Sequence, residues 1–282
     1  MPQTLSTVVP LRRPLSEITA SYDANLRRLR NLRANFSTRQ VLAAADIDHI
    51  DQAMLRPYAT ARHDNSAVQI ERNNVHKFAQ PQFGRLDVVY LGDEAVACNL
   101  GRGFMRTGKR YWSSFRFGYP QAVFSDRKRL NEVNAINTYL ALEWAIGNGF
   151  DYYDLGMSLA CPDGGLLHWK RRRKGVLDTL GNHGYFYVRL PRKGTAQFLW
   201  NAPLFAVEYG KLTLHLGIPD GKSDEDILTR YREMGFSGLT KVYLHCQQPI
   251  SESLVERFRS IYALQKSPPK IVSITSNPAG VS

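Results

Sequence analysis

Apolar residues recur at helical spacing along the chain that follows Ser16. Steps of three and four residues predict an amphipathic helix, and its apolar positions are Ile18, Tyr22, Leu26, Leu29 and Leu32. A second helix is predicted from Ala44 onward. It is expected to end near Pro57, because the residue before a proline disfavours the helical conformation.

The middle of the chain changes to the alternation that is typical of strands. Residues 85–104 predict two strands around the turn Gly92-Asp93, and residues 109–120 predict a third strand, aromatic at alternate positions. The clearest helix covers residues 129–150, with an apolar stripe at Val133, Ile136, Leu140 and Trp144. The strand "DYYDLGM" (151–157) follows it. Hairpin strands, a helix and another strand predict a mixed sheet with a packed helix.

The last third of the chain alternates between the two patterns. After a predicted strand over 184–191, strands are predicted over 211–219 and 241–246 and helices over 223–236 and 251–264. Ser223 and Ser251 stand where helix N-caps are expected. This order predicts an appended βαβα element.

Together the patterns predict an α/β (α+β) fold with a mixed, mostly antiparallel sheet, packed helices and a C-terminal βαβα extension. We expect a main domain over residues 15–190, helical in its N-terminal part (15–60), and an extension over 191–265. Residues 1–14 contain three prolines, and residues 266–282 are rich in proline and serine. Both ends are therefore expected to be flexible.

Composition narrows the class of protein. Hydrophobic residues make up 43% of the 282 residues, which is enough for a folded core, and the formal net charge is +12. Such a charge favours an anionic partner: nucleic acid, a phosphorylated cofactor, an acidic carrier protein or an anionic membrane. Cys98, Cys161 and Cys246 are widely spaced, and the histidines are scattered. We therefore expect no disulfide framework and no metal site.

The N-terminus lacks the apolar run of a signal peptide, and no segment is long and apolar enough to span a membrane. A soluble, cytoplasmic protein is expected.

The stretch "DYYDLGMSLACPDGGLLHWKRRRKG" (151–175) carries the most chemistry. Asp154 lies inside an aromatic strand. Burial of a carboxylate there costs solvation free energy, unless the group is paired with a partner or serves a function. Gly156 has no side chain, so a ligand can approach the backbone there. After Trp169 come five cations, Lys170 to Lys174. Two interpretations stay open: an edge strand with a basic surface loop, or a ligand cleft walled by the strand and covered by a cationic loop.

The arginines of the first helix also allow two interpretations. Arg30 and Arg33 belong to an arginine-rich helix that is either a solvated face or an element that contacts phosphate, for which the guanidinium fork is suited.

The 151–175 stretch, preceded by the helix "VNAINTYLALEWAIGNG", resembles the C-terminal part of GNAT-superfamily acyltransferases of the FemAB-like and CelD-like (cellulose-biosynthesis-associated) branch. The shared features are the "DLG" strand, a loop, and an aromatic-lysine-basic run that ends in glycine. "SYDANLRRLRNLR" (21–33) is similar to the family's upstream helix, so the resemblance covers residues 15–190. Lys170 is five residues before Gly175 rather than four, so Lys170 or Arg171 fills the family's lysine position. The family's glycine-rich pyrophosphate loop is replaced by "SDRKRLNEVN" (125–134).

The resemblance implies a GNAT-like fold and direct transfer of an acyl or aminoacyl group from a thioester or ester to an amine. The co-substrate is acyl-CoA, an acyl-carrier protein or aminoacyl-tRNA, and no tightly bound cofactor, metal or covalent intermediate is implied. Asp154 would orient or deprotonate the amine. Lys170 or backbone N–H groups near Gly156 would stabilise the oxyanion. The expected binding residues are Arg116, Tyr119, Gly156, Trp169, Arg171, Arg172, Arg30 and Arg33.

Two other functions remain open at this point. A non-catalytic RNA-binding protein would use basic patches and stacking aromatic residues, namely Tyr111, Trp112, Phe115 and Phe117. A degenerate acyltransferase fold that serves as a scaffold would lack a cleft beside Gly156.

Overall fold

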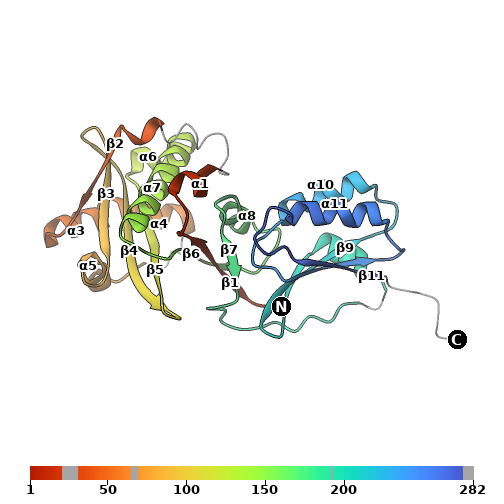
Figure 1. Cartoon of the computed structure of the whole chain (residues 1–282). Coiled ribbons are helices and arrows are strands. Elements are labelled where there is room, and N and C mark those ends of the chain that lie inside the picture. Colours follow the sequence, from red (N-terminus) through yellow and green to blue (C-terminus); the bar gives the residue numbers. More distant parts are fainter. Residues whose placement is uncertain (21–30, 65–68, 192, 276–282) are drawn as a thin grey trace. The chain divides into compact units, whose positions relative to one another are not determined.

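A computed structural model of the chain describes residues 1–20, 31–64, 69–191 and 193–275 (Figure 1). The chain forms two compact units. Val9–Leu155 make up one, here called the inserted unit, and Met1–Val8 with Gly156–Ser282 make up the other, the terminal unit. Strands β1 (Thr4–Pro10) and β6 (Tyr152–Leu159) each run from one unit into the other.

The sheet of the inserted unit has the order β2-β3-β4-β5-β6. Its first four strands are antiparallel, and β5 and β6 are parallel. The bounds are Phe36–Gln40 for β2, Arg85–Leu91 for β3, Glu94–Arg106 for β4 and Lys109–Gly118 for β5. Thr107 and Gly108 both have positive φ angles, as the tight turn of a two-residue hairpin requires. The predicted mixed, mostly antiparallel sheet is confirmed.

Helices cover both faces of this sheet (Figure 1). Val89 of β3 packs with the long helix α7 (Arg127–Gly147), whereas its neighbour Val88 packs with the helices on the opposite face. Successive strand residues point to opposite faces, which explains the split. The helices of the second face, with the π-helix η1 among them, are α3 (Ala44–Ile50), η1 (Asp51–Leu55), α4 (Arg56–His63) and α5 (Arg72–Ala79). Two short helices complete the described part of the unit, α1 (Leu15–Ala20) and α6 (Gln121–Phe124).

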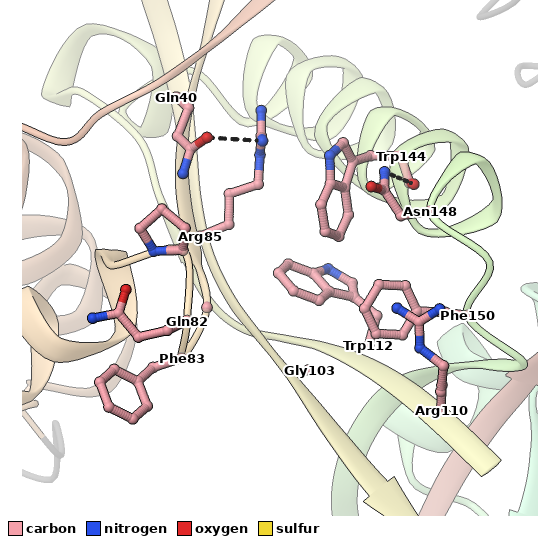
Figure 2. Close-up of a pocket in the computed structure, with 12 residues that line it drawn as sticks. Gln40, Gln82, Phe83, Arg85, Gly103, Arg110, Trp112, Trp144, Asn148 and Phe150 are labelled. Atoms are coloured by element: carbon pink, nitrogen blue, oxygen red, sulfur yellow. Dashed lines mark hydrogen bonds between the residues drawn. The ribbon is translucent and has the colours of Figure 1, made fainter.

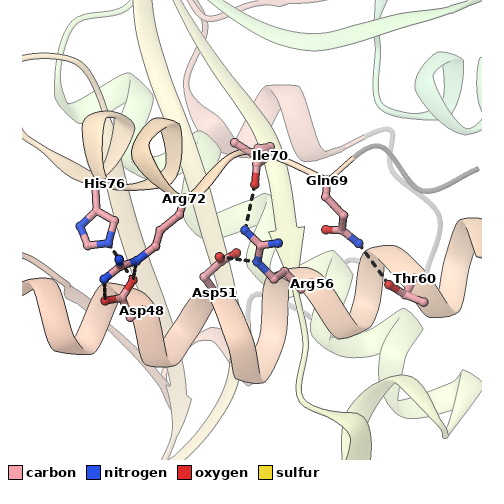
Figure 3. A network of polar contacts seen from close by, with 8 residues as sticks. All are labelled: Asp48, Asp51, Arg56, Thr60, Gln69, Ile70, Arg72 and His76. Atoms are coloured by element: carbon pink, nitrogen blue, oxygen red, sulfur yellow. Dashed lines mark hydrogen bonds and ion pairs between the residues drawn. The ribbon is translucent and has the colours of Figure 1, made fainter.

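Ion pairs hold the α3–η1–α4 run to α5 (Figure 3). The Asp48 carboxylate accepts hydrogen bonds from Arg72 Nε at 2.7 Å and lies 2.8 Å from His76 Nε2. These two partners hold the pKa of Asp48 well below its usual range. Asp51 pairs with Arg56 at 2.6 Å, and Arg56 also donates to the carbonyl of Ile70. The polar contacts therefore fix how the helices sit on this face of the sheet.

The terminal unit contains β1 in the order β6-β1-β7, with β7 (Val176–Asp178) antiparallel to β1, and helix α8 (Gly165–Arg172). Its second sheet has the order β11-β10-β9-β8, parallel from β9 to β11. The strands are β8 (Leu204–Glu208), β9 (Lys211–Ile218), β10 (Lys241–Cys246) and β11 (Lys270–Thr275). The helices are α9 (Thr195–Asn201), α10 (Asp224–Tyr231), the 3₁₀ turn η3 (Arg232–Met234) and α11 (Glu252–Tyr262).

Local signals in the sequence are confirmed in this unit. The Ser223 hydroxyl accepts a hydrogen bond from the Asp226 N–H, and the Ser251 hydroxyl accepts one from the Leu254 N–H. Both serines are N-caps, as predicted. The predicted βαβα element is present between Lys211 and Tyr262, and the structure adds β8 before it and β11 after it.

Several predictions are wrong. The lead 1–14 is not flexible throughout, because Thr4–Pro10 form the mostly buried strand β1, in which Pro10 is the last residue. Pro57 does not end a helix: it lies in the first turn of α4, which continues directly from η1. Residues 184–191 form no strand apart from a single bridge at Tyr185. Residues 270–275 of the expected tail form β11.

The two units also differ in their bounds from the ranges 15–190 and 191–265 expected from the sequence. Residues 156–190 and the first eight residues group with the C-terminal part of the chain. The reason is pairing over a long sequence distance, since Ser6 of β1 lies opposite Asp178 of β7.

A close backbone approach at Gly217 gives a stability prediction. A Cβ there would lie 1.9 Å from the Ala196 carbonyl oxygen of α9. Gly217→Ala is therefore expected to lower the free energy of unfolding by about 2–4 kcal/mol, measured by urea denaturation. Gly165→Ala is the matched control, because its Cβ meets nothing within 4 Å. Equal stability of the two variants would contradict the packing of α9 on β9.

The histidine pair on the same sheet gives a prediction about pH. His215 Nδ1 and His245 Nε2 are 2.9 Å apart, and burial, together with the charge of His215, lowers the pKa of His245 to about 4 from 6.5. The unfolded chain then binds more protons between these values, so stability falls as the pH drops from 6.5 to 4. We expect a loss of about 2–3 kcal/mol. Unfolding measured at several pH values should show a flatter dependence of stability on pH for His245→Asn. The control His183→Asn, at an exposed histidine, should keep the dependence of the wild type. If stability fell equally with pH in both variants, His245 would not be the cause.

Candidate functional site

The parallel pairing of β5 with β6 is short. It comprises three residue pairs, Tyr111↔Tyr152, Trp112↔Tyr153 and Ser113↔Asp154. Asp154 is therefore the last paired residue, although β5 continues to Gly118 and β6 to Leu159. Beyond the last pair the backbone groups of the two strands are not used in this ladder. A carboxylate at the point where two parallel strands separate is well placed to meet a ligand.

Gly156 breaks the regular conformation of β6 two residues later. Its φ angle is +75°, in the left-handed region that favours glycine, and a Cβ there would meet no atom within 4 Å. The glycine is thus required by the turn of the backbone and not by crowding. Space next to the backbone remains at this point.

Lys170 lies against this break. Its side chain is 1% exposed, and its Nζ donates a hydrogen bond of 2.6 Å to the Gly156 carbonyl oxygen. Both residues belong to the terminal unit. The cationic run was expected as a loop, but residues 165–172 form helix α8, which points Lys170 inward. Arg171 instead pairs with Glu233. Lys170 is thus the residue of this pair that reaches the strand, whereas which of the two fills the family's lysine position stays a prediction.

The other cations of this run have local partners. The Arg173 guanidinium lies 3.6 Å from the centre of the Trp169 ring and donates to the Trp169 carbonyl. Arg172 is more than half exposed and lies 4.0 Å from Glu233. Trp169 is half-buried and Arg172 is exposed, and neither makes the Lys170–Gly156 contact.

The remaining expected site residues belong to the inserted unit. Tyr119 is fully buried and donates to Asn134 Oδ1 at 2.8 Å. Arg116 is half-buried on β5, where burial lowers the pKa of its guanidinium. Arg33 donates to Glu143 and to the Phe36 carbonyl. Arg30 lies outside the described residues. The roles of these residues in binding stay predictions.

The expected site residues therefore fall into two groups. Asp154, Arg116, Tyr119 and Arg33 lie in the inserted unit, and Gly156, Trp169, Lys170, Arg171 and Arg172 lie in the terminal unit. Within the terminal unit the structure brings Lys170 to Gly156. Asp154 precedes Gly156 by two residues along the same strand, β6.

The start of α7 carries a further residue that the sequence analysis did not single out. Asp126 is its N-cap and accepts hydrogen bonds from the N–H groups of Lys128 and Arg129 at 2.8 and 3.1 Å. This segment stands where the resemblance would place a pyrophosphate loop. Its first N–H groups are occupied by a carboxylate, so an anion would have to displace Asp126.

The inserted unit also contains a pocket of about 310 Å³ (Figure 2). Arg85, Arg110, Trp112, Trp144 and Phe150 are among the residues that line it. The sequence analysis used Trp144 only as part of an apolar stripe and did not connect it with the others. The sequence does not reveal this pocket, because its lining residues lie far apart in the chain, on three separate elements and in the loop after α7.

The aromatic surface expected of an RNA-binding protein is not exposed at two of its four positions. Tyr111 and Trp112 are buried. The Tyr111 ring stacks between Phe104 and Tyr152, with ring centres 5.2 and 4.8 Å apart. Neither ring is exposed as a stacking surface for RNA, so this part of the RNA-binding interpretation is wrong.

Two searches for relatives by sequence found nothing: no family model and no curated protein matches the chain. The described residues contain no helix long and apolar enough to cross a membrane.

Solved structures do show likeness. FemX aligns with 61% of this chain and 59% of its own, at 12% identity and a TM-score of 0.46. The C-terminal domain of a putative lysylphosphatidylglycerol synthetase from Agrobacterium fabrum aligns with 63% of this chain and 58% of its own, at 12% identity and a TM-score of 0.40. An aminoglycoside acetyltransferase from an uncultured soil sample, in complex with sisomicin, aligns with 57% of this chain and 99% of its own, at 14% identity and a TM-score of 0.34.

The chain thus spans somewhat under two thirds of the length of the first two structures. A Fem protein and an acetyltransferase are among these neighbours. All these TM-scores lie below 0.5, so the neighbours do not define what this chain binds or transfers.

The left-handed conformation of Gly156 gives a prediction for this site. Gly156→Val is expected to destabilise the protein by about 1–2 kcal/mol, because a β-branched residue is strained at this φ angle. Gly156→Asn should cost less, since asparagine tolerates the left-handed region. Thermal unfolding of the two variants measures the difference. Equal losses would show that the φ angle is not the cause.

Proposed function

We propose that this protein is an N-acyltransferase that moves an acyl or aminoacyl group from a thioester or ester donor to an amine. The observation that carries the proposal is the buried Lys170 ammonium on the Gly156 carbonyl, 2.6 Å away. It supports the proposal because it joins the aromatic-lysine motif to the strand that holds Asp154. Those are the two motifs on which the acyltransferase resemblance depends.

Asp154 is the proposed base. A primary amine is protonated at neutral pH and must lose a proton before or as its nitrogen attacks the carbonyl carbon. In this mechanism the new C–N bond forms, the C–S or C–O bond of the donor breaks, and the released thiol or hydroxyl takes up a proton. The Asp154 carboxylate accepts the amine proton. Asp154 belongs to the last β5–β6 residue pair, and beyond it the two strands are no longer joined by this ladder. This position supports the role, because a ligand can enter between the separated strands.

The tetrahedral intermediate of this reaction carries an oxyanion that needs hydrogen-bond donors. The N–H groups next to Gly156 are the proposed donors, since the left-handed φ angle turns the backbone at that point. We assign Lys170 a positioning role: its ammonium is buried and holds the Gly156 carbonyl. Loss of the ammonium would release the backbone that presents these donors.

The donor is proposed to be an aminoacyl-tRNA or an acyl-carrier protein in preference to acyl-CoA. The Asp126 carboxylate occupies the N–H groups at the start of α7, which disfavours a pyrophosphate there. The net charge of +12 supports a large anionic donor.

Substitution of Asp154 tests the function. Asp154→Asn is expected to lower kcat for acyl transfer at least 100-fold, as loss of a general base does. Transfer from aminoacyl-tRNA, acyl-carrier protein and acyl-CoA to a panel of primary amines would be measured with a labelled acyl group. Asp93→Asn, in the exposed β3–β4 turn, is the matched control.

Lys170→Met serves as a second variant of similar length, and Lys174→Met, at the end of the same cationic run, is its control. The positioning role predicts a large loss of kcat for Lys170→Met with KM for the donor little changed. The proposal would fail if no donor gave product, or if Asp154→Asn remained within threefold of the Asp93→Asn control, a spread typical of indirect effects.

A further inference from the structure

The pocket of the inserted unit is separate from the Asp154 site. Trp112 lines it and pairs with Tyr153, whereas Asp154 pairs with the next residue, Ser113. Successive side chains of a strand point to opposite faces. The Asp154 side chain therefore lies on the face of the sheet opposite to Trp112, and the pocket has no role in the proposed transfer step.

One side of the pocket is an aromatic wall (Figure 2). The Trp112 and Trp144 ring centres are 4.4 Å apart, and Phe150 lies 5.4 Å from Trp112 and 5.8 Å from Trp144. Trp112 is 4% exposed, and its indole N–H has no hydrogen-bond partner among the described residues. Such a wall offers flat apolar surface to a ring and leaves one buried donor unused.

Two guanidinium groups line the pocket, and only one of them is paired with a carboxylate. Arg85 donates to Asp87 Oδ2 at 2.6 Å and to Gln40 Oε1 at 3.0 Å, so its charge is neutralised. Arg110 lies 4.6 Å from the Phe150 ring centre and donates to the Gly149 carbonyl at 3.3 Å. Within the described part of the chain, no carboxylate lies within ion-pair distance of the Arg110 guanidinium. The Arg110 guanidinium is therefore available to a ligand anion, while the Asp151 carboxylate accepts the backbone N–H of the same residue at 3.0 Å.

The rest of the lining suits a polar ring edge. Gln82 and Asn148 supply neutral amide groups, and none of the 12 residues drawn in Figure 2 is acidic. Gly103 of β4 lies close to Phe150: a Cβ there would meet the Phe150 ring at 3.2 Å, so a larger residue would crowd the pocket. The volume lies at the lower end of the range for small-molecule sites, which fits a single ring system with one substituent.

We propose that this pocket binds a small molecule that carries one anionic group, a carboxylate or a phosphate, and a flat ring, joined directly or through a linker. Arg110 binds the anion through its planar fork, and Trp112, Trp144 and Phe150 form the surface on which the ring lies. Aryl carboxylates and nucleoside monophosphates share this chemistry.

The test separates the ring from the anion. Binding to the full chain would be measured by calorimetry and by tryptophan fluorescence. The ring-bearing anions are AMP, UMP, indole-3-acetate and benzoate. The controls are the neutral rings adenosine and indole, and the free anions inorganic phosphate and acetate. At least one ring-bearing anion is expected to bind on the order of tenfold or more tightly than its neutral ring and than its free anion. Whether the nucleotides or the aryl carboxylates bind identifies the source.

Arg110→Gln should weaken this binding at least tenfold, and Arg106→Gln, in the same hairpin but outside the pocket, should not. Gly103→Val, which fills the pocket, gives a second route to the same loss, with thermal unfolding as the check on folding. Binding to none of the compounds, or binding equal for rings and ring-bearing anions, or binding unaffected by both pocket variants, would overturn the proposal. Acyl transfer by the Arg110→Gln variant is expected to match wild type, so a failure here leaves the transfer proposal intact.

Discussion

The buried ammonium of Lys170 is the contact on which the proposed site depends. An ammonium group that leaves water loses several kcal/mol of solvation, and it remains charged only if hydrogen-bond acceptors replace the water. The Gly156 carbonyl is one such acceptor. Gly156 itself adopts a φ angle of +75°, so this acceptor lies at the break in β6. The position of helix α8, the break in β6 and the burial of the charge therefore require one another.

Much of the fold could be predicted from the sequence where its causes are local. The β3–β4 hairpin follows from Gly92-Asp93, α7 follows from its apolar stripe, and α10 begins at Ser223 because a hydroxyl caps its N–H groups. Strands β1 and β11 were missed for the opposite reason. Each is a short segment near proline residues whose partners lie elsewhere in the chain, and only tertiary pairing makes it a strand.

The residues of the candidate site also differ in whether they could be predicted from local sequence. Asp154, Gly156 and Lys170 could be singled out because they belong to one continuous stretch with an unusual order of residue types. That Lys170, not Arg171, reaches the strand could not be predicted, since it depends on the helical phase of α8. The burial of Tyr119 and its hydrogen bond to Asn134 likewise could not be predicted, because they depend on how α7 packs on the sheet.

The two-unit division has a consequence for synthesis of the chain. Val9–Leu155 is continuous, so its sheet and both helical layers have every partner available once this segment has left the ribosome. Residues Thr4–Val8 of β1 differ, because the side chain of Ser6 meets the carbonyl of Asp178, 172 positions later. Thr4–Val8 therefore remain unpaired with β7 until the inserted unit and residues 156–178 have been synthesised. Slow elongation through residues 156–178 would therefore extend the interval during which a hydrophobic strand edge is open to other chains.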